Sequence, residues 1–77
     1  MFKKINKEKV RKAIEVTEEW IKRAEAKGVK DTFDDKNGNR GATILWCEKR
    51  NLKLYKKMLN LTYFKELGSL KELYKAI

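Results

Sequence analysis

The chain has 77 residues, with 20 Lys and Arg against 11 Asp and Glu for a net charge of +9, one cysteine and no histidine. This length allows a single domain over residues 1–77, and one cysteine excludes a disulfide framework. Without histidine the usual Cys/His metal sites and histidine-based catalysis are excluded, so we expect no metal, no cofactor and no enzyme activity.

Hydropathy and charge restrict the class of partner. No apolar run approaches the roughly 18 to 20 residues that a membrane-spanning helix needs, and the N-terminal sequence MFKKINKEKV lacks the apolar core of a signal peptide. With the single cysteine, these features predict a cytoplasmic protein that has no membrane partner. The positive charge favours nucleic acid or an acidic protein surface as the partner.

The first periodic segment predicts an amphipathic helix from about Lys7 to Lys27. Asn6 is suited to cap its N-terminus, and Gly28 is suited to end it. Charges of opposite sign four residues apart predict a solvated, self-neutralised surface on one side. The other side repeats at intervals of three and four residues and is expected to face the core; it consists of Val10, Ala13, Ile14, Thr17, Trp20, Ile21 and Ala24.

Residues 28–42, GVKDTFDDKNGNRGA, hold three of the four glycines. The dipeptide Asn37-Gly38 is typical of a type I′ turn, so a short hairpin is one interpretation. The other, which we prefer, is an ordered loop with Phe33 in the core. A calcium loop of the EF-hand type does not fit, because its first and last ligand positions would fall on Phe33 and Ile44. The aspartates are expected to stabilise turns.

A second helix is predicted from about Thr43 to Leu67, with a bend allowed at residues 60–62. Its apolar residues fill an arc of about 200°, wider than packing on one neighbour requires. We therefore expect burial on two sides, against the first helix and the C-terminal segment or against a second copy in a homodimer. Cys47 is expected to be a core residue. The arc consists of Ile44, Cys47, Leu52, Leu54, Tyr55, Met58, Leu59 and Leu61.

The C-terminal residues predict a short third helix after a break at Gly68. Ser69 and Glu72 have the spacing of a capping box, and Leu70, Leu73, Tyr74 and Ile77 form a small apolar face. The predicted fold is all-α: a small single-domain bundle of two long antiparallel helices plus a short C-terminal helix, with a Gly-rich loop or short hairpin at about 28–42. A DNA-binding helix-turn-helix over residues 63–77 fits poorly, because the bulky Phe64 stands where a small residue is usual.

The candidate binding surface is the basic side of the second helix, within EKRNLKLYKKML at 48–59. Its five cations share an arc of about 120° in which no acid of the same helix falls. Like charges on one face repel each other, so an anionic partner would favour this arrangement. Lysines suit phosphate contact, arginine suits bidentate contact, and tryptophan suits stacking. The candidate residues are Trp46, Lys49, Arg50, Lys53, Lys56, Lys57 and Asn60.

Two functions are consistent with this surface. The first is a small nucleic-acid-binding accessory or regulatory protein. The second is a protein-binding inhibitor or adaptor, of the phage or mobile-element type, that blocks a host or defence complex through the same basic face and Trp46. The alternative without a binding role is a solvated lysine-rich face whose repulsion is relieved by glutamates of the first helix.

Overall fold

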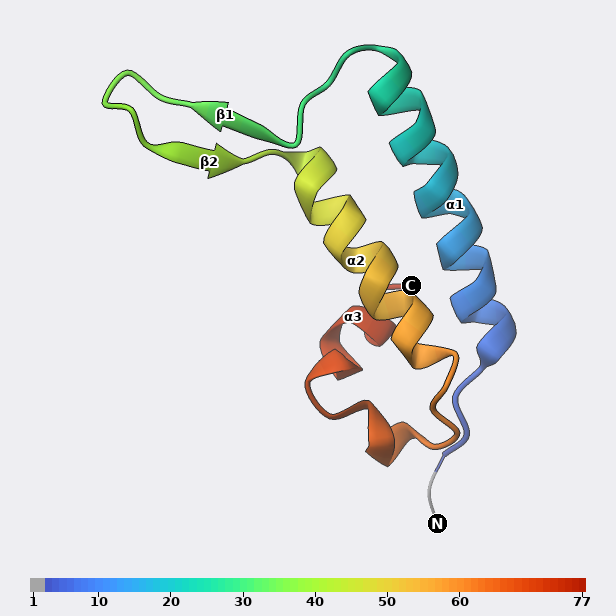
Figure 1. Cartoon of the computed structure of the whole chain (residues 1–77). Coiled ribbons are helices and arrows are strands. Elements are labelled where there is room, and N and C mark those ends of the chain that lie inside the picture. Colours follow the sequence, from blue (N-terminus) through green and yellow to red (C-terminus); the bar gives the residue numbers. More distant parts are fainter. Residues whose placement is uncertain (1–2) are drawn as a thin grey trace.

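The structure is a computed structural model, and it describes residues 3–77. Its elements follow in the order α1 (Lys7–Ala26), β1 (Thr32–Asp34), β2 (Arg40–Ala42), α2 (Ile44–Met58), the 3-10 segment η1 (Phe64–Leu70) and α3 (Lys71–Lys75). The two long helices α1 and α2 run in opposite directions, the hairpin of β1 and β2 projects from one end, and the C-terminal segment folds back at the other (Figure 1). The predicted small helical bundle is confirmed in outline, but the two-stranded sheet means that the fold is not strictly all-α.

Helix α1 forms where the sequence predicted it, and both predicted caps are present. The Asn6 side chain accepts a hydrogen bond from the Lys9 amide at 3.2 Å, and Gly28 leaves the helix with a φ of 82°, in the left-handed region. The prediction that Trp20 joins the core is wrong, because it lies on the flank of the buried stripe and is 40 % exposed. The buried stripe consists of Val10, Ile14, Thr17, Ile21 and Ala24.

Residues 32–42 form a hairpin, so the preferred loop interpretation is wrong. Its turn is also not of type I′, because Gly38 adopts a positive φ of 79° and Asn37 does not. The Gly38 amide donates to the Asp35 carbonyl at 3.1 Å, as in a type I turn followed by a left-handed residue. The Asp35 carboxylate accepts from the Asn37 and Asn39 amides, both at 2.8 Å. The strand pairs are Thr32↔Ala42, Phe33↔Gly41 and Asp34↔Arg40.

Phe33 packs within the hairpin and not in the core. Its ring lies over Gly41 of the opposite strand, where a Cβ atom would be 2.5 Å from the Phe33 Cζ. Glycine at this position therefore lets the aromatic ring cover the strand, a contact that helps to fix strand register. With 54 % of Phe33 exposed, the hairpin is held by its own cross-strand contacts more than by the bundle.

Helix α2 ends at Met58, and the prediction that it continues to Leu67 is wrong. The chain turns at residues 59–62 and pairs with the N-terminal segment. The Ile5 amide donates to the Thr62 carbonyl at 3.1 Å, and the Phe64 amide donates to the Lys3 carbonyl at 2.7 Å. Since these partners lie about three quarters of the chain length away, helical periodicity carried no sign of them.

The buried face of α2 starts at Leu45, one residue later than predicted. Leu45 is fully buried whereas Ile44 is 69 % exposed. Cys47 is exposed too, so its predicted place in the core is wrong. Near the end of the helix, Tyr55 and Met58 are buried as predicted. The wide predicted arc thus included residues of the first turn that face solvent.

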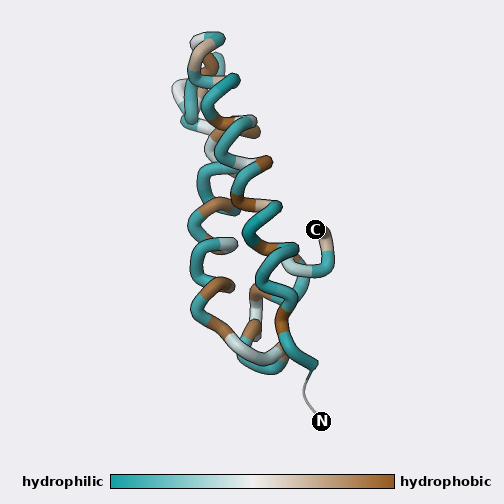
Figure 2. The backbone as a smooth tube through the Cα atoms, turned by 90° about the vertical axis from the view of Figure 1, so that its right-hand side faces the viewer, coloured by the Kyte–Doolittle hydropathy of each residue, from teal (hydrophilic) through white to brown (hydrophobic). Residues whose placement is uncertain are grey.

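The core has two parts, which lie at different ends of the bundle. Near the hairpin, a small cluster joins Ile21, Ala24 and Leu45. At the other end, a larger cluster is covered by the predicted apolar face of the C-terminal segment and contains Ile5, Val10, Ile14, Tyr55, Met58 and Leu67. Figure 2 shows the apolar positions recurring between hydrophilic ones along both long helices. The hairpin end therefore rests on the smaller core.

The C-terminal segment turns at Gly68, whose φ of 52° and ψ of −121° are avoided by residues with a side chain. The predicted capping box of Ser69 and Glu72 is not formed, because α3 begins only at Lys71 and has no side-chain cap. The glycine turn and the docking of Leu70 and its neighbours on the core position this short helix instead.

Glu66 caps η1, and this contact makes stability depend on pH. Its carboxylate accepts from the Tyr63 amide at 2.9 Å and the Thr62 amide at 2.6 Å. These bonds lower the Glu66 pKa from its ordinary value of 4.5, with the Tyr63 bond the larger cause. A carboxyl group whose pKa is lower in the folded state stabilises the fold above its unfolded pKa, and the stabilisation is lost as pH falls through the folded pKa.

We therefore expect Glu66→Gln to lower the midpoint of thermal unfolding at neutral pH, and we expect this difference to shrink as pH falls through the folded pKa of Glu66. Thermal unfolding followed by circular dichroism between about pH 7 and pH 2 measures the difference. A constant difference over this whole range would show that ionisation of Glu66 is irrelevant to stability.

Candidate nucleic-acid interface

Four of the seven candidate residues form a continuous row along α2. Trp46, Arg50, Lys53 and Lys57 follow one another at intervals of four, three and four residues, which places them on one side of a helix. All four are exposed, and Trp46 keeps 42 % of its surface open. We call these four residues the basic row. It points away from the core because the buried positions of α2, such as Leu45 and Tyr55, lie on other sides of the helix.

Trp46 and Arg50 are in contact within the basic row. The Arg50 guanidinium carbon lies 6.0 Å from the centre of the Trp46 ring, at the limit of a cation–π contact. The contact holds an aromatic face next to a planar cation, one turn apart on the helix. Such a pair can accept a stacked base or ring together with a phosphate or carboxylate.

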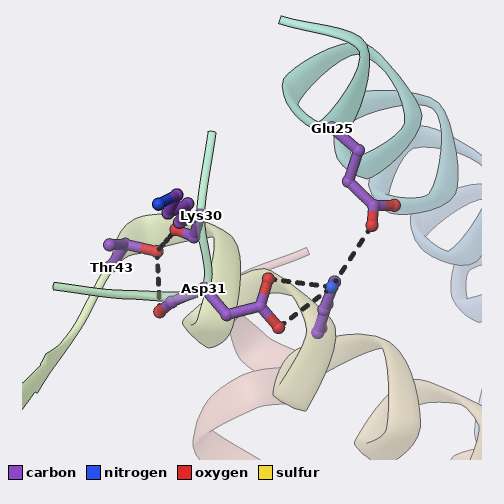
Figure 3. Close-up of polar contacts among 5 residues, drawn as sticks. Glu25, Lys30, Asp31 and Thr43 are labelled. Atoms are coloured by element: carbon purple, nitrogen blue, oxygen red, sulfur yellow. Dashed lines mark hydrogen bonds and ion pairs between the residues drawn. The ribbon is translucent and has the colours of Figure 1, made fainter. Parts of the chain in front are cut away.

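Lys49 is set apart from the basic row by two carboxylates. Its ammonium donates to both Asp31 carboxylate oxygens at 2.9 Å and lies 3.4 Å from the Glu25 carboxylate (Figure 3). The hydrogen bond with Asp31 is the largest cause of a raised Lys49 pKa, and Glu25 adds to it. The arc contains no acid of α2, but at Lys49 acids from other parts of the chain reach into it.

This contact ties the start of the hairpin to both helices. Glu25 belongs to α1, Asp31 precedes β1 and Lys49 belongs to α2. Beside it, the Thr43 hydroxyl donates to the Lys30 carbonyl at 2.7 Å and the Asp31 carbonyl at 2.9 Å (Figure 3). Lys49 thus orients the hairpin, and no spacing within α2 itself could have identified its partners.

The remaining candidates border the basic row. Lys56 is exposed on its edge, and Asn60 is exposed just beyond the helix end, where its amide donates to the Lys57 carbonyl at 3.1 Å. Phe64 does not extend this surface: it packs edge-on against Tyr74 with ring centres 5.9 Å apart. Within residues 3–77 no ion pair engages Arg50, Lys53, Lys56 or Lys57.

The acidic residues of the hairpin are engaged in local contacts. The Asp34 carboxylate pairs with Arg40 at 3.5 Å, and the Asp35 carboxylate accepts the turn amides. Within the described part of the chain, no three Cys, Asp or Glu residues come together as metal ligands would. Likewise, no helix within residues 3–77 has both the length and the apolar character required to cross a bilayer.

Comparison with protein-family models, curated proteins and solved structures finds no match to this chain.

Proposed function

We propose that this protein binds nucleic acid through the basic row of α2, with Lys56 and Asn60 at its edge. The observation that carries the proposal is the separation of charges. Helix α1 has acids spaced four residues from its cations, and one of these pairs, Glu19–Arg23, is closed at 3.1 Å; α2 has no acid on the side of the basic row, whose cations form no ion pair within residues 3–77. A line of unpaired cations gains most from phosphates, which release their counterions on binding.

The residue types of the row suggest how each contact is made. Lys53 and Lys57 would contact backbone phosphates without regard to sequence. Arg50 would contact a phosphate through two parallel hydrogen bonds. Trp46, at the hairpin end of the row, would stack on an exposed base, which favours a single strand or a strand end over an intact duplex.

The salt dependence of binding tests the proposal. The full chain is titrated against a fluorescent 20-nucleotide single strand and a matched duplex, with anisotropy as the readout and salt raised from about 50 mM. Three to four phosphate contacts predict a log–log slope of about −3 on duplex. If neither probe binds at about 50 mM salt, the protein is not a nucleic-acid-binding protein of this kind.

A second candidate function is favoured by the contact between Trp46 and Arg50. These residue types dominate binding energy in protein interfaces. Under this alternative the basic row occupies an acidic groove of one protein partner, as an inhibitor or adaptor would. A partner captured from lysate after nuclease treatment, and lost with Trp46→Ala, would favour it over nucleic-acid binding.

A further inference from the structure

Phe33 presents an open aromatic face on the hairpin. A Cβ atom at Gly41 would lie 2.5 to 3.1 Å from three atoms of the Phe33 ring, so the ring turns its face, and not its edge, to the opposite strand. The other face is open, since 54 % of Phe33 is exposed. The other glycines, at 28, 38 and 68, have a positive φ, whereas Gly41 does not. The backbone therefore does not require glycine at this position, and the close approach of the ring does.

The Phe33 side of the hairpin turns toward the basic row. Side chains alternate along a strand, so Asp31 and Phe33 lie on the same face of the hairpin. The ladder includes Asp31, whose carbonyl accepts from the Thr43 amide at 2.9 Å. The Asp31 carboxylate reaches Lys49 of α2. Because Lys49 is three residues from Trp46 and four from Lys53, this contact joins the Phe33 face of the hairpin to the edge of the basic row.

The hairpin and α2 thus form the two sides of a corner. The hairpin projects from the start of α2 away from α1 (Figure 1). The basic row also points away from the bundle, since Trp46 and the buried Tyr55 are about 180° apart around the helix axis. Trp46 lies at the hairpin end of the row, and Phe33 lies on the hairpin itself. Two aromatic rings are therefore available where the row meets the hairpin.

We propose that the site takes single-stranded nucleic acid and extends onto the hairpin, so that a strand held by the basic row stacks a second base on the open face of Phe33. This inference rests on the proposed function of the basic row. Every base has a π face, so the contact does not depend on sequence. In an intact duplex the bases are stacked on one another and none is free for Phe33. The ring would therefore add affinity for single strands only.

The charges of the hairpin fit a stacking contact and not a phosphate contact. Residues 30–42 contain three cations and three acids. The acids are engaged by Lys49, by Arg40 and by amides of the turn. Glu25, the other acid at Lys49, belongs to α1 and not to the hairpin. The hairpin thus adds no net attraction for phosphates, which leaves that role to the basic row.

Phe33→Ala tests the inference with the same 20-nucleotide single strand and matched duplex, followed by anisotropy from about 50 mM salt. Affinity for the single strand should fall at least about fivefold, because one stacked base is lost. Its salt slope and the affinity for duplex should stay at their wild-type values, since the ring replaces no counterion. Val29→Ala is the matched control and should change neither affinity. Val29 is 44 % exposed in the same connection, but its amide is bonded to Ala24 at the end of α1.

Two further variants separate stacking from support of the hairpin. Phe33→Leu keeps an apolar group over Gly41 but has no aromatic face, so it should lose as much affinity for the single strand as Phe33→Ala. Phe33→Trp keeps the aromatic face and should bind at least as tightly as the wild type.

Three results would overturn the inference and leave the basic row as the binding site: wild-type affinity in Phe33→Leu, weak binding by Phe33→Trp, or an equal loss for single strand and duplex in Phe33→Ala. Failure of the wild type to bind either probe would instead overturn the proposed function, and the role of Phe33 with it.

Discussion

Replacement of both Lys53 and Lys57 by glutamate is expected to reduce nucleic-acid affinity about 100-fold at low salt and to reduce the salt slope by about 2. The physical reason is that the loss of each lysine removes one phosphate contact, and each glutamate adds repulsion at the same position. Both side chains are exposed, so the fold should be retained. Fluorescence anisotropy against the 20-nucleotide strand and the duplex measures both quantities.

The control has to separate the basic row from net charge alone. Lys30→Glu with Lys36→Glu makes the same change in net charge at two exposed positions of the hairpin segment. This variant should lose much less affinity and keep most of the wild-type slope. An equal loss in both double variants would indicate diffuse electrostatic attraction and would argue against a site on α2.

Leu45→Ala is expected to lower the free energy of unfolding by about 2–4 kcal/mol. Leu45 is fully buried and packs with Ile21 and Ala24 in the small cluster near the hairpin. Truncation removes apolar burial and leaves a cavity that two helices cannot easily close. Because a domain of this size has a total stability of about 4–11 kcal/mol, the loss is a large fraction of it.

Ile44→Ala is the matched control, since the Ile44 side chain, next to Leu45 in the sequence, is 69 % exposed. It should change the free energy of unfolding by less than about 0.5 kcal/mol. Urea unfolding followed by circular dichroism gives both values, provided that the slope against urea is unchanged. Equal losses at the two positions would place the start of the buried face of α2 one residue earlier.

In helix α1 the predictions that depended on local rules are confirmed, with the exception of Trp20. Asn6 and Gly28 cap α1 because caps satisfy backbone groups within a few residues of themselves. The buried stripe of α1 follows helical spacing because residues three and four apart lie on the same side of a helix. The prediction that Trp20 is buried was wrong because a pattern of period 3.6 defines a broad face of the helix but does not say how much of that face a neighbouring element will cover.

The predictions that depended on distant partners are wrong in specific ways. The chain leaves α2 for a segment that is hydrogen-bonded to residues 3–5. The hairpin was missed for a nearer reason, since Phe33 packs on Gly41 of the opposite strand and not in the core. In the candidate surface, the exposure of Arg50 and Lys53 follows from the phase of the helix. The engagement of Lys49 does not, because Asp31 and Glu25 reach it from outside α2.

The pairing of residues 3–5 with 62–64 has a kinetic consequence. The bond from Ile5 to Thr62 closes a loop that contains about three quarters of the described chain, and the entropy of closing such a loop must be lost before the contact contributes any energy. Helices α1 and α2 form from contacts between near neighbours, so they can fold first. We expect the strand-like pairing that joins the ends to form last and to limit the folding rate.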